Sequence, residues 1–365
     1  MSKCKLCHKE SRFVSQHLGF CLNCIREDFP KVKPFILEVH RKIRQEFNLP
    51  LQPPQVKEGV SCRLCVNECK IPEGERGVCG LRENFKGHLR GADLQKGSLE
   101  FYFDSLPTNC VASWVCPGCS EAGFPEFSYK PGPEYGYKNL AVFYNGCSFN
   151  CLFCQNYHFR ETLTRLPQKF ISPQQLVEVI DDKTSCICYF GGDPACQLPH
   201  SISTSKLALK NKKGRILRIC WETNGFLSKN LLKEMVEISL VSGGCIKFDL
   251  KAYTESLHIA LTGVSNRRTL ENFKEAARYI DKRRSPPLLV ASTLLVPGYI
   301  DEYEVEKISK FIASQNPQIP YSLLGFYPCF YMEDLPFTFK DFALRCGEIA
   351  LNWRLKSWAI FKFLR

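Results

Sequence analysis

Six short apolar runs alternate with helical patterns from residue 140 onward, and this alternation constrains the fold more than any other feature. The six runs are "LAVFYN" (140–145), "CICYF" (186–190), "ILRICWETN" (216–224), "CIKFDLK" (245–251), "LLVASTLLVPG" (288–298) and "YSLLGFYP" (321–328). Helix starts lie between them, because Ser172 and Ser228 suit N-caps and Pro173 suits a first helical turn. Regular alternation of strand and helix predicts an α/β fold with a parallel sheet, either doubly wound or curled toward a barrel.

Polar or glycine-rich segments follow the apolar runs. In both arrangements of a parallel sheet, functional groups collect at the carboxyl ends of the strands. The ends of the second, third and fourth runs carry Gly191, Gly192, Asp193 ("GGDP"), Glu222, Thr223, Asn224 ("ETNG"), Asp249 and Lys251 ("DLK"). Asp249 and Lys251 are two residues apart and therefore point to the same side of an extended chain. We expect these segments to face one common site.

The first run leads into "NGCSFNCLFCQN", which offers three thiols, Cys147, Cys151 and Cys154, with no obvious fourth. A zinc site completed by a distant ligand such as His158 is one interpretation. It leaves the other strand ends unexplained. A metal centre with one open position is the interpretation that we favour, because the strand ends then surround a ligand of that centre.

The three-cysteine loop, followed in order by these strand ends, resembles the radical S-adenosylmethionine (SAM) superfamily. The closer similarity is to the glycyl-radical-activating branch, meaning pyruvate formate-lyase activating enzyme and relatives, including AmmeMemoRadiSam-type proteins. The resemblance rests on the Cx3Cx2C loop, Phe153, "GGDP" where the family usually has GGEP, "ETNG", "DLKAY" (249–253), "LTGV" (261–264) and "LVPGY" (295–299). It covers roughly residues 60 to 340. The fold that it implies is a partial, six-stranded, TIM-like (β/α)6 barrel.

The same resemblance implies a chemistry. The three thiolates would hold a [4Fe-4S] cluster whose open iron chelates SAM, and reductive cleavage would give a 5′-deoxyadenosyl radical that abstracts hydrogen. The backbone of Gly191, Gly192 and Asp193 would hold the methionine amino group, and Lys251, oriented by Asp249, would meet its carboxylate. The polar contacts near the sulfonium and ribose would come from Glu222, Thr223 and Asn224. Phe153 and Val296 would flank the adenine.

One position departs from the family pattern. Close relatives carry a histidine near the sixth strand end, where this chain has "GFYPCF" with Tyr327 and Cys329. Cys329 could donate a hydrogen atom or ligate metal, and a buried structural thiol is the third option.

Three further cysteine groups precede the barrel region. "CKLC" and "CLNC" supply Cys4, Cys7, Cys21 and Cys24, an arrangement typical of a closed zinc site. "CRLCVNECKIPEGERGVCG" supplies Cys62, Cys65, Cys69 and Cys79, resembles a region of the AmmeMemoRadiSam-type proteins, and suits zinc or an auxiliary iron–sulfur cluster. The third group, Cys110, Cys116 and Cys119, is one ligand short of four. Cys329 or His88 could supply the missing ligand of a zinc ion or an iron–sulfur cluster there.

The 21 cysteines indicate metal ligation in a reducing cytosol rather than disulfides. Seven of them (Cys186, Cys188, Cys196, Cys220, Cys245, Cys329, Cys346) are scattered through apolar sequence and are expected to be mainly core residues. The chain shows no membrane-spanning run and no signal peptide, so we expect a cytoplasmic protein. The formal net charge of +12 admits RNA as a partner without requiring it.

The expected organisation has four parts: a zinc-ribbon-like module with a helix (1–55), a cysteine-rich metal or iron–sulfur region (56–138), a radical SAM core (139–340) and a C-terminal helical extension (341–365). The predicted function is hydrogen abstraction from a substrate, with a protein as the favoured substrate and flavodoxin or ferredoxin as the electron donor. Two alternatives stay open, an RNA-modifying radical SAM enzyme and a catalytically inactive zinc-ribbon binding protein.

Overall fold

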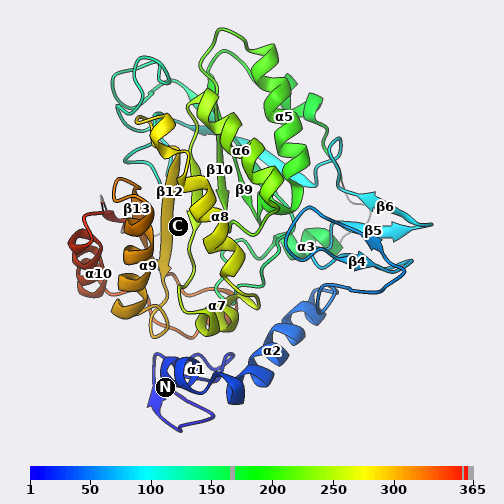
Figure 1. The fold of residues 1–365 in the computed structure, drawn as a ribbon, viewed down its shortest axis with the longest axis vertical. Coiled ribbons are helices and arrows are strands. Elements are labelled where there is room, and N and C mark those ends of the chain that lie inside the picture. The colour runs from blue at the N-terminus through cyan, green and yellow to red at the C-terminus, as the bar shows by residue number, and fades with distance from the viewer. Residues whose placement is uncertain (165–168, 356, 361–365) are drawn as a thin grey trace.

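The computed structural model describes residues 1–164, 169–355 and 357–360, and its centre is a curved eight-stranded sheet (Figure 1). The strands follow the order β14-β13-β12-β11-β10-β9-β8-β7. Their bounds are β7 (Leu99–Ser105), β8 (Lys138–Tyr144), β9 (Thr184–Gly191), β10 (Arg218–Thr223), β11 (Ile246–Asp249), β12 (Leu289–Leu295), β13 (Tyr321–Gly325) and β14 (Ser357–Ile360). Neighbours from β8 to β14 are parallel, and β7 pairs with β8 antiparallel.

The six predicted strands are confirmed as β8 to β13, in chain order across the sheet. Two edge strands were not predicted. β7 lies in a segment expected to form metal-held loops, and most of its side chains are exposed or half-buried, so it lacks the apolar run of a central strand. β14 lies in the predicted C-terminal helical extension, which therefore combines a helix and a strand; residues 356 and 361–365 lie outside the described residues.

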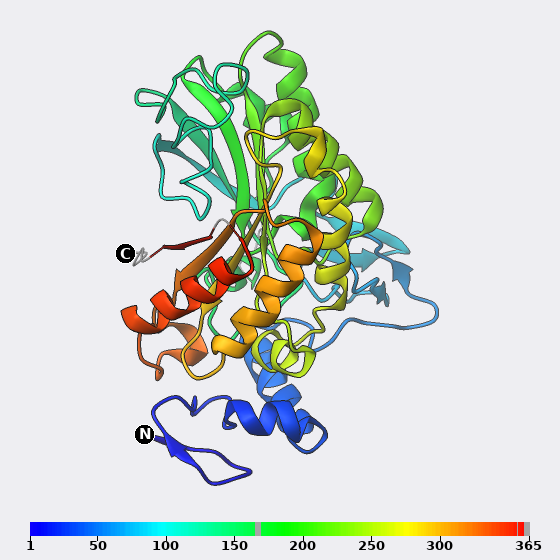
Figure 2. The same cartoon turned by 60° about the vertical axis from the view of Figure 1, so that its left-hand side comes forward.

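Helices cover one face of the sheet (Figure 2). Their bounds are α3 (Phe159–Thr164), α4 (Pro173–Glu178), α5 (Leu198–Asn211), α6 (Lys229–Ser242), α7 (Glu255–Thr262), α8 (Arg267–Ala277), α9 (Glu302–Gln315) and α10 (Lys340–Asn352), with 3-10 turns η1 (Pro194–Gln197), η2 (Ile280–Lys282) and η3 (Phe330–Met332). Ser172 forms a capping box with Gln175 at the start of α4, and Ser228 is the N-cap of α6. The helical pattern of residues 266–283 predicts one long helix, whereas the structure divides this segment into α8 and η2.

Alternating side chains of the sheet face two different environments. On β8 the outward positions Leu140, Val142 and Tyr144 are fully buried against helices, and Ile187, Tyr189, Ile219 and Trp221 continue this layer on β9 and β10. The opposite, concave face is covered by the long loop of residues 106–137, whose Trp114 indole donates to Ser322 Oγ at 3.2 Å. The loop therefore lies inside the partial barrel.

Two small hairpin sheets precede the barrel. Their strands are β3 (Val60–Ser61), β4 (Lys70–Ile71), β5 (Arg82–Phe85) and β6 (His88–Gly91). The β5–β6 hairpin projects from the side of the barrel near α3 (Figure 1). The cysteines of this segment flank the β3–β4 hairpin, where Cys62 N donates to the Cys69 carbonyl at 2.8 Å.

The N-terminal module comprises β1 (Ser2–Lys3), β2 (Glu10–Ser11), α1 (Leu22–Glu27) and α2 (Phe29–Glu46). It docks on the loop that follows β12, where the Tyr299 hydroxyl accepts from Ser15 N at 2.9 Å and donates to the Phe20 carbonyl at 3.0 Å. Arg26 adds a bidentate ion pair with Asp301, at 2.6 and 2.7 Å. Because that loop follows a strand's carboxyl end, the module lies beside the face where a barrel places its site.

The buried face of α2 differs from the predicted one. The four-residue spacing of Phe35, Val39, Ile43 and Phe47 predicts one buried helix face. Ile43 is buried as this spacing predicts, but Phe35 is 60% exposed, and the helix also buries Val32, Ile36 and His40. His40 Nε2 lies 3.1 Å from the Ala260 carbonyl of α7, so the helix packs beneath the barrel rim. None of the described helices combines the length and the apolar character that a membrane crossing requires.

Candidate active site at the carboxyl ends of the strands

The three-cysteine loop follows β8 and is fixed by backbone hydrogen bonds. Asn150 N donates to the Thr262 carbonyl at 2.8 Å and Leu152 N to the Leu261 carbonyl at 3.0 Å. The "LTGV" segment at the end of α7 therefore holds the loop in place. Burial raises the pKa of Cys151 to about 12, so this thiol is protonated until a cation displaces its proton.

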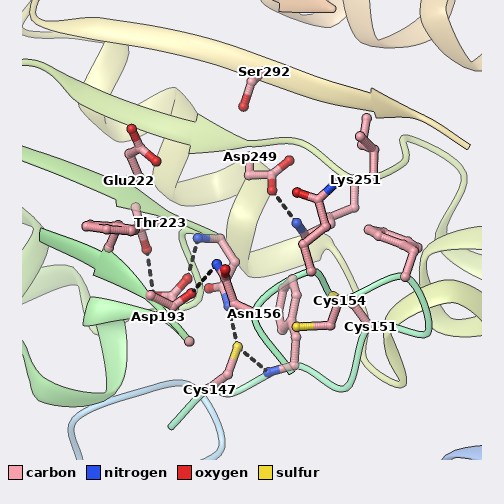
Figure 3. Close-up of a pocket in the computed structure, with 18 of the residues that line it drawn as sticks. Cys147, Cys151, Cys154, Asn156, Asp193, Glu222, Thr223, Asp249, Lys251 and Ser292 are labelled. Atoms are coloured by element: carbon pink, nitrogen blue, oxygen red, sulfur yellow. Dashed lines mark hydrogen bonds and ion pairs between the residues drawn. The ribbon is translucent and has the colours of Figure 1, made fainter. Parts of the chain in front are cut away.

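A pocket of about 190 Å³, partly open to solvent, lies over this loop (Figure 3). All three cysteines line it, together with Gly191, Gly192, Asp193, Glu222, Thr223, Asn224, Asp249, Lys251 and Phe153. The structure therefore brings together every residue that the sequence predicts for the cofactor site except Val296. Within the described chain, β12 contributes Ser292 and Leu294 to this pocket, whereas Val296 is fully buried in the turn that follows.

The two glycines of "GGDP" are required by a close approach of two backbones. Gly192 N donates to the Tyr144 carbonyl at 2.8 Å, and Asp193 N donates to the Gly146 carbonyl at 2.9 Å. A Cβ on Gly192 would lie 2.5 Å from that Gly146 oxygen. The N–H groups of this turn are thus used internally, and its carbonyl oxygens are the groups suited to accept from an amino group.

The Asp193 carboxylate ties the end of β9 to the end of β10. It accepts from Asn224 N at 2.6 Å, Ala195 N at 2.7 Å and Thr223 Oγ1 at 2.9 Å (Figure 3). Burial nonetheless raises the pKa of Asp193 to about 6. Asn224 extends the network, because its Nδ2 lies 3.2 Å from Ser148 Oγ and 3.6 Å from Cys147 Sγ. This network fixes Cys147 relative to the strand ends.

Lys251 and Asp249 form an ion pair on the opposite side of the pocket. Burial disfavours the Lys251 ammonium, but the Asp249 carboxylate holds its pKa above the ordinary value. The ammonium also lies 5.5 Å from the centre of the Phe153 ring, within cation–π range. A cation is therefore fixed beside the cysteine loop.

Sequence reasoning missed two cations of the site. Lys247, on β11, is 3% exposed and pairs with Glu222 at 2.8 Å, so Glu222 is already engaged. Arg160, on α3, is 1% exposed and lines the pocket. A signal for Lys247 was present in "CIKFDLK", where Lys247, Asp249 and Lys251 alternate and therefore point to the same side of the strand. The sequence held no signal for Arg160, because α3 follows the cysteine loop without a recognisable pattern.

Among the described residues that line the pocket, two buried polar atoms have no hydrogen-bond partner. They are Asp249 Oδ1, an acceptor, and Arg160 Nη1, a donor. Buried polar groups are ordinarily hydrogen-bonded, so such atoms indicate a ligand. Three thiols on one wall, a free acceptor and a free donor fit an iron–sulfur cluster carrying SAM, whose amino, carboxylate and sulfonium groups need such partners.

The N-terminal cysteine group is compact. All four Sγ atoms, of Cys4, Cys7, Cys21 and Cys24, lie within 4.8 Å of one another. Among the residues that the structure describes, no other group of three or more potential metal ligands is this compact. Cys4 Sγ lies 3.7 Å from Cys24 Sγ, and Cys7 Sγ lies 3.6 Å from Cys21 Sγ. This group can bind a metal ion.

The second group gains a thiol that the sequence assigned to the core. Cys196, two residues after Pro194 of "GGDP", lies beside Cys65 and Cys79. Cys62, Cys65, Cys69, Cys79 and Cys196 therefore form one neighbourhood next to the "GGDP" turn, and its metal stays a prediction.

The third group does not meet the partners proposed for it. Cys329 Sγ donates to the Phe153 carbonyl at 3.5 Å, beside the three-cysteine loop, and His88 is exposed on β6. Cys110 instead lies 3.0 Å from Lys247 Nζ. His158, the alternative zinc ligand for the loop, is largely exposed and pairs with Glu161 at 3.7 Å.

Comparison with known proteins yields matches over the same region. The sequence profile of the radical SAM superfamily matches residues 141–312. A Methanocaldococcus jannaschii protein assigned as a glycyl-radical enzyme activating enzyme is 30% identical over 216 residues, which cover 57% of this chain and 75% of that protein. Pyruvate formate-lyase 1-activating enzyme of Escherichia coli (strain K12) is 25% identical over 166 residues, 44% of this chain and 62% of the enzyme. A solved domain of pyruvate-formate lyase-activating enzyme from Bacteroides vulgatus aligns with a TM-score of 0.38 and 18% identity over 47% of this chain and 97% of that domain.

Proposed function

The chain belongs to the radical SAM superfamily, in the branch of the glycyl-radical activating enzymes, and we propose that it abstracts hydrogen from a protein substrate. One observation carries this proposal. The three-cysteine loop faces a pocket whose other walls are the ends of β9, β10 and β11, each with polar groups directed into it. When bound at Cys147, Cys151 and Cys154, the cluster would supply the electron that cleaves SAM to methionine and a 5′-deoxyadenosyl radical.

The protein's own part is to hold and orient SAM. Lys251 would bind the methionine carboxylate as a point charge, and Asp249 orients the ammonium and offers its unpartnered Oδ1 to a donor. The carbonyl oxygens of the Gly191–Asp193 turn would accept from the amino group, with Asn156 Nδ2, 2.9 Å from the Gly191 oxygen, bracing the turn. Phe153 supplies an aromatic wall. Arg160 would balance negative charge on the cluster.

Two features support a protein as the substrate. The relatives named as activating enzymes act, by their names, on other enzymes. The N-terminal module lies beside the pocket's face of the barrel through Tyr299 and Asp301, where a docked polypeptide would meet both. The electron donor would be a small redox protein such as flavodoxin or ferredoxin.

The direct test is product formation. The anaerobically reconstituted protein with dithionite and SAM is expected to form 5′-deoxyadenosine, and Lys251→Met is expected to raise the SAM concentration for half-maximal rate by about 10- to 100-fold, the worth of one charged hydrogen bond. Liquid chromatography with mass spectrometry measures both. A fully reconstituted cluster that yields no 5′-deoxyadenosine would contradict the proposal. Transfer of deuterium from tRNA rather than protein into the product would instead establish an RNA substrate.

We also propose that Cys4, Cys7, Cys21 and Cys24 hold a zinc ion. Zinc–thiolate bonds of about 2.3 Å in a tetrahedron place sulfurs about 3.8 Å apart, close to the two observed separations of 3.7 and 3.6 Å. Cys7→Ser is expected to lower bound zinc by about one ion per chain, measured by inductively coupled plasma mass spectrometry. Cys346→Ser, a buried cysteine of α10, is the control and should retain it. Equal zinc in both variants would exclude this site.

A further inference from the structure

The interior of the partial barrel has an unusual lining. Barrel interiors are ordinarily filled with branched apolar side chains. Here the inward positions of β8 to β11 that line one cavity, partly open to solvent, are Asn139, Ala141, Cys186, Cys188, Phe190, Cys220, Glu222 and Lys247. Ala141 and the three cysteines leave this space open, so three of the eight side chains are thiols. The outward positions of the same strands carry the expected large apolar residues, so the exception is confined to the interior.

The loop of residues 106–137 adds two more thiols to the same cavity. Cys110 and Cys116 both line it. The loop is anchored to the sheet, because its Glu134 forms a fully buried ion pair with Arg218 of β10 at 2.5 Å. Cys119 Sγ points instead to the Thr108 carbonyl at 3.6 Å, beside Cys116 rather than in the cavity lining.

A buried cation lies among these thiols. Lys247 Nζ is 3.0 Å from Cys110 Sγ and 3.4 Å from Cys188 Sγ, and one carboxylate, Glu222, completes its surroundings at 2.8 Å. Burying an ammonium is costly unless anions surround it. Thiolates bound to a metal supply negative charge where neutral thiols do not, and Lys247 is placed to balance it.

We propose that the barrel interior holds a second iron–sulfur cluster, ligated by Cys110 and Cys116 of the loop and by Cys188 and Cys220 of β9 and β10. Four thiolates are the complete ligand set of such a cluster. A cluster rather than zinc is favoured because these thiols are spread around a cavity and lack the compact spacing of the N-terminal group. The cavity shares Phe190, Glu222 and Lys247 with the pocket of the three-cysteine loop, so the two centres are neighbours.

The test counts metal in a full-length chain that lacks the loop cluster. In the background Cys147→Ala, Cys151→Ala, Cys154→Ala, reconstituted anaerobically, iron and acid-labile sulfide are measured for Cys188→Ser with Cys220→Ser and for the control Cys346→Ser. The double variant is expected to hold about four fewer irons per chain than the control if the cluster is [4Fe-4S], and about two fewer if it is [2Fe-2S]. Equal iron in both, or the loss of a zinc ion in place of iron, would overturn the proposal. This readout does not depend on SAM cleavage.

A folding defect in the double variant would also lower its iron, so circular dichroism accompanies the count. If that variant is unfolded, the isosteric single change Cys188→Ser in the same background tests whether Cys188 is a ligand of the cluster. Exchange of one thiolate for an oxygen ligand is expected to shift the g-values of the reduced cluster in electron paramagnetic resonance relative to Cys346→Ser. An unchanged spectrum in a folded Cys188→Ser protein would show that Cys188 is not a ligand.

Discussion

An alanine in place of Cys147 is expected to remove about four irons per chain and to lower 5′-deoxyadenosine formation to that of an enzyme-free control. Two thiols remain on the loop, and Asn224 Nδ2 and Phe149 N lose the sulfur that they contact at 3.6 and 3.3 Å. The loop backbone should persist, since its bonds to Leu261 and Thr262 do not involve the thiol. Iron analysis and chromatography of the product give the two readouts.

Cys329→Ser is the matched control for that experiment. Its thiol lies beside the same loop and donates to the Phe153 carbonyl at 3.5 Å, but it is not among the residues that line the described pocket. This variant should keep the iron and form 5′-deoxyadenosine. Full iron in Cys147→Ala would contradict the assigned ligand, and loss of iron in Cys329→Ser would make Cys329 a fourth ligand of the loop.

The fold was predictable where local pattern and tertiary position agree. The six predicted strands, β8 to β13, are mostly buried, so each appears in the sequence as an apolar run, and the polar or glycine-rich ends of β9, β10 and β11 meet in the pocket as expected. β7 was not predicted, because an antiparallel edge strand with exposed side chains has no such run. The exposure of Phe35 on α2 was not predicted, because the packing of this helix against α7 sets its buried face.

The thiols of the barrel interior could not be predicted from spacing. Cys188 and Cys220 are isolated in apolar sequence, which is the pattern of a small core residue, and only the parallel pairing of β9 with β10 places them together. The strand register puts Cys220 directly opposite Cys188. Cys110 and Cys116 join them through a loop without periodicity. Spacing predicts ligands within a local segment, whereas this set depends on register and on how the loop folds back.

The loop's attachment leads to a large expected effect on stability. Glu134 and Arg218 are both fully buried, and Glu134 also accepts from Ser185 Oγ at 2.8 Å and from Tyr129 N at 2.8 Å. Glu134→Gln would leave the Arg218 charge buried without a counter-ion. The free energy of unfolding is therefore expected to fall by ~3–5 kcal/mol, measured by denaturant titration.

The exposed ion pair between Glu275 of α8 and Arg278, the C-cap of that helix, is the matched comparison for the buried pair. Its two charged groups lie 2.8 Å apart. Glu275→Gln is expected to change the free energy of unfolding by less than ~1 kcal/mol, because solvent screens an exposed ion pair. The double variant Glu134→Leu with Arg218→Met separates charge from packing. If the uncompensated charge causes the loss in Glu134→Gln, the double variant should be more stable than that single variant, because no buried charge remains. If the double variant is equally destabilised, the hydrogen bonds that Glu134 accepts from Ser185 and Tyr129 hold the loop, and the ion pair contributes little.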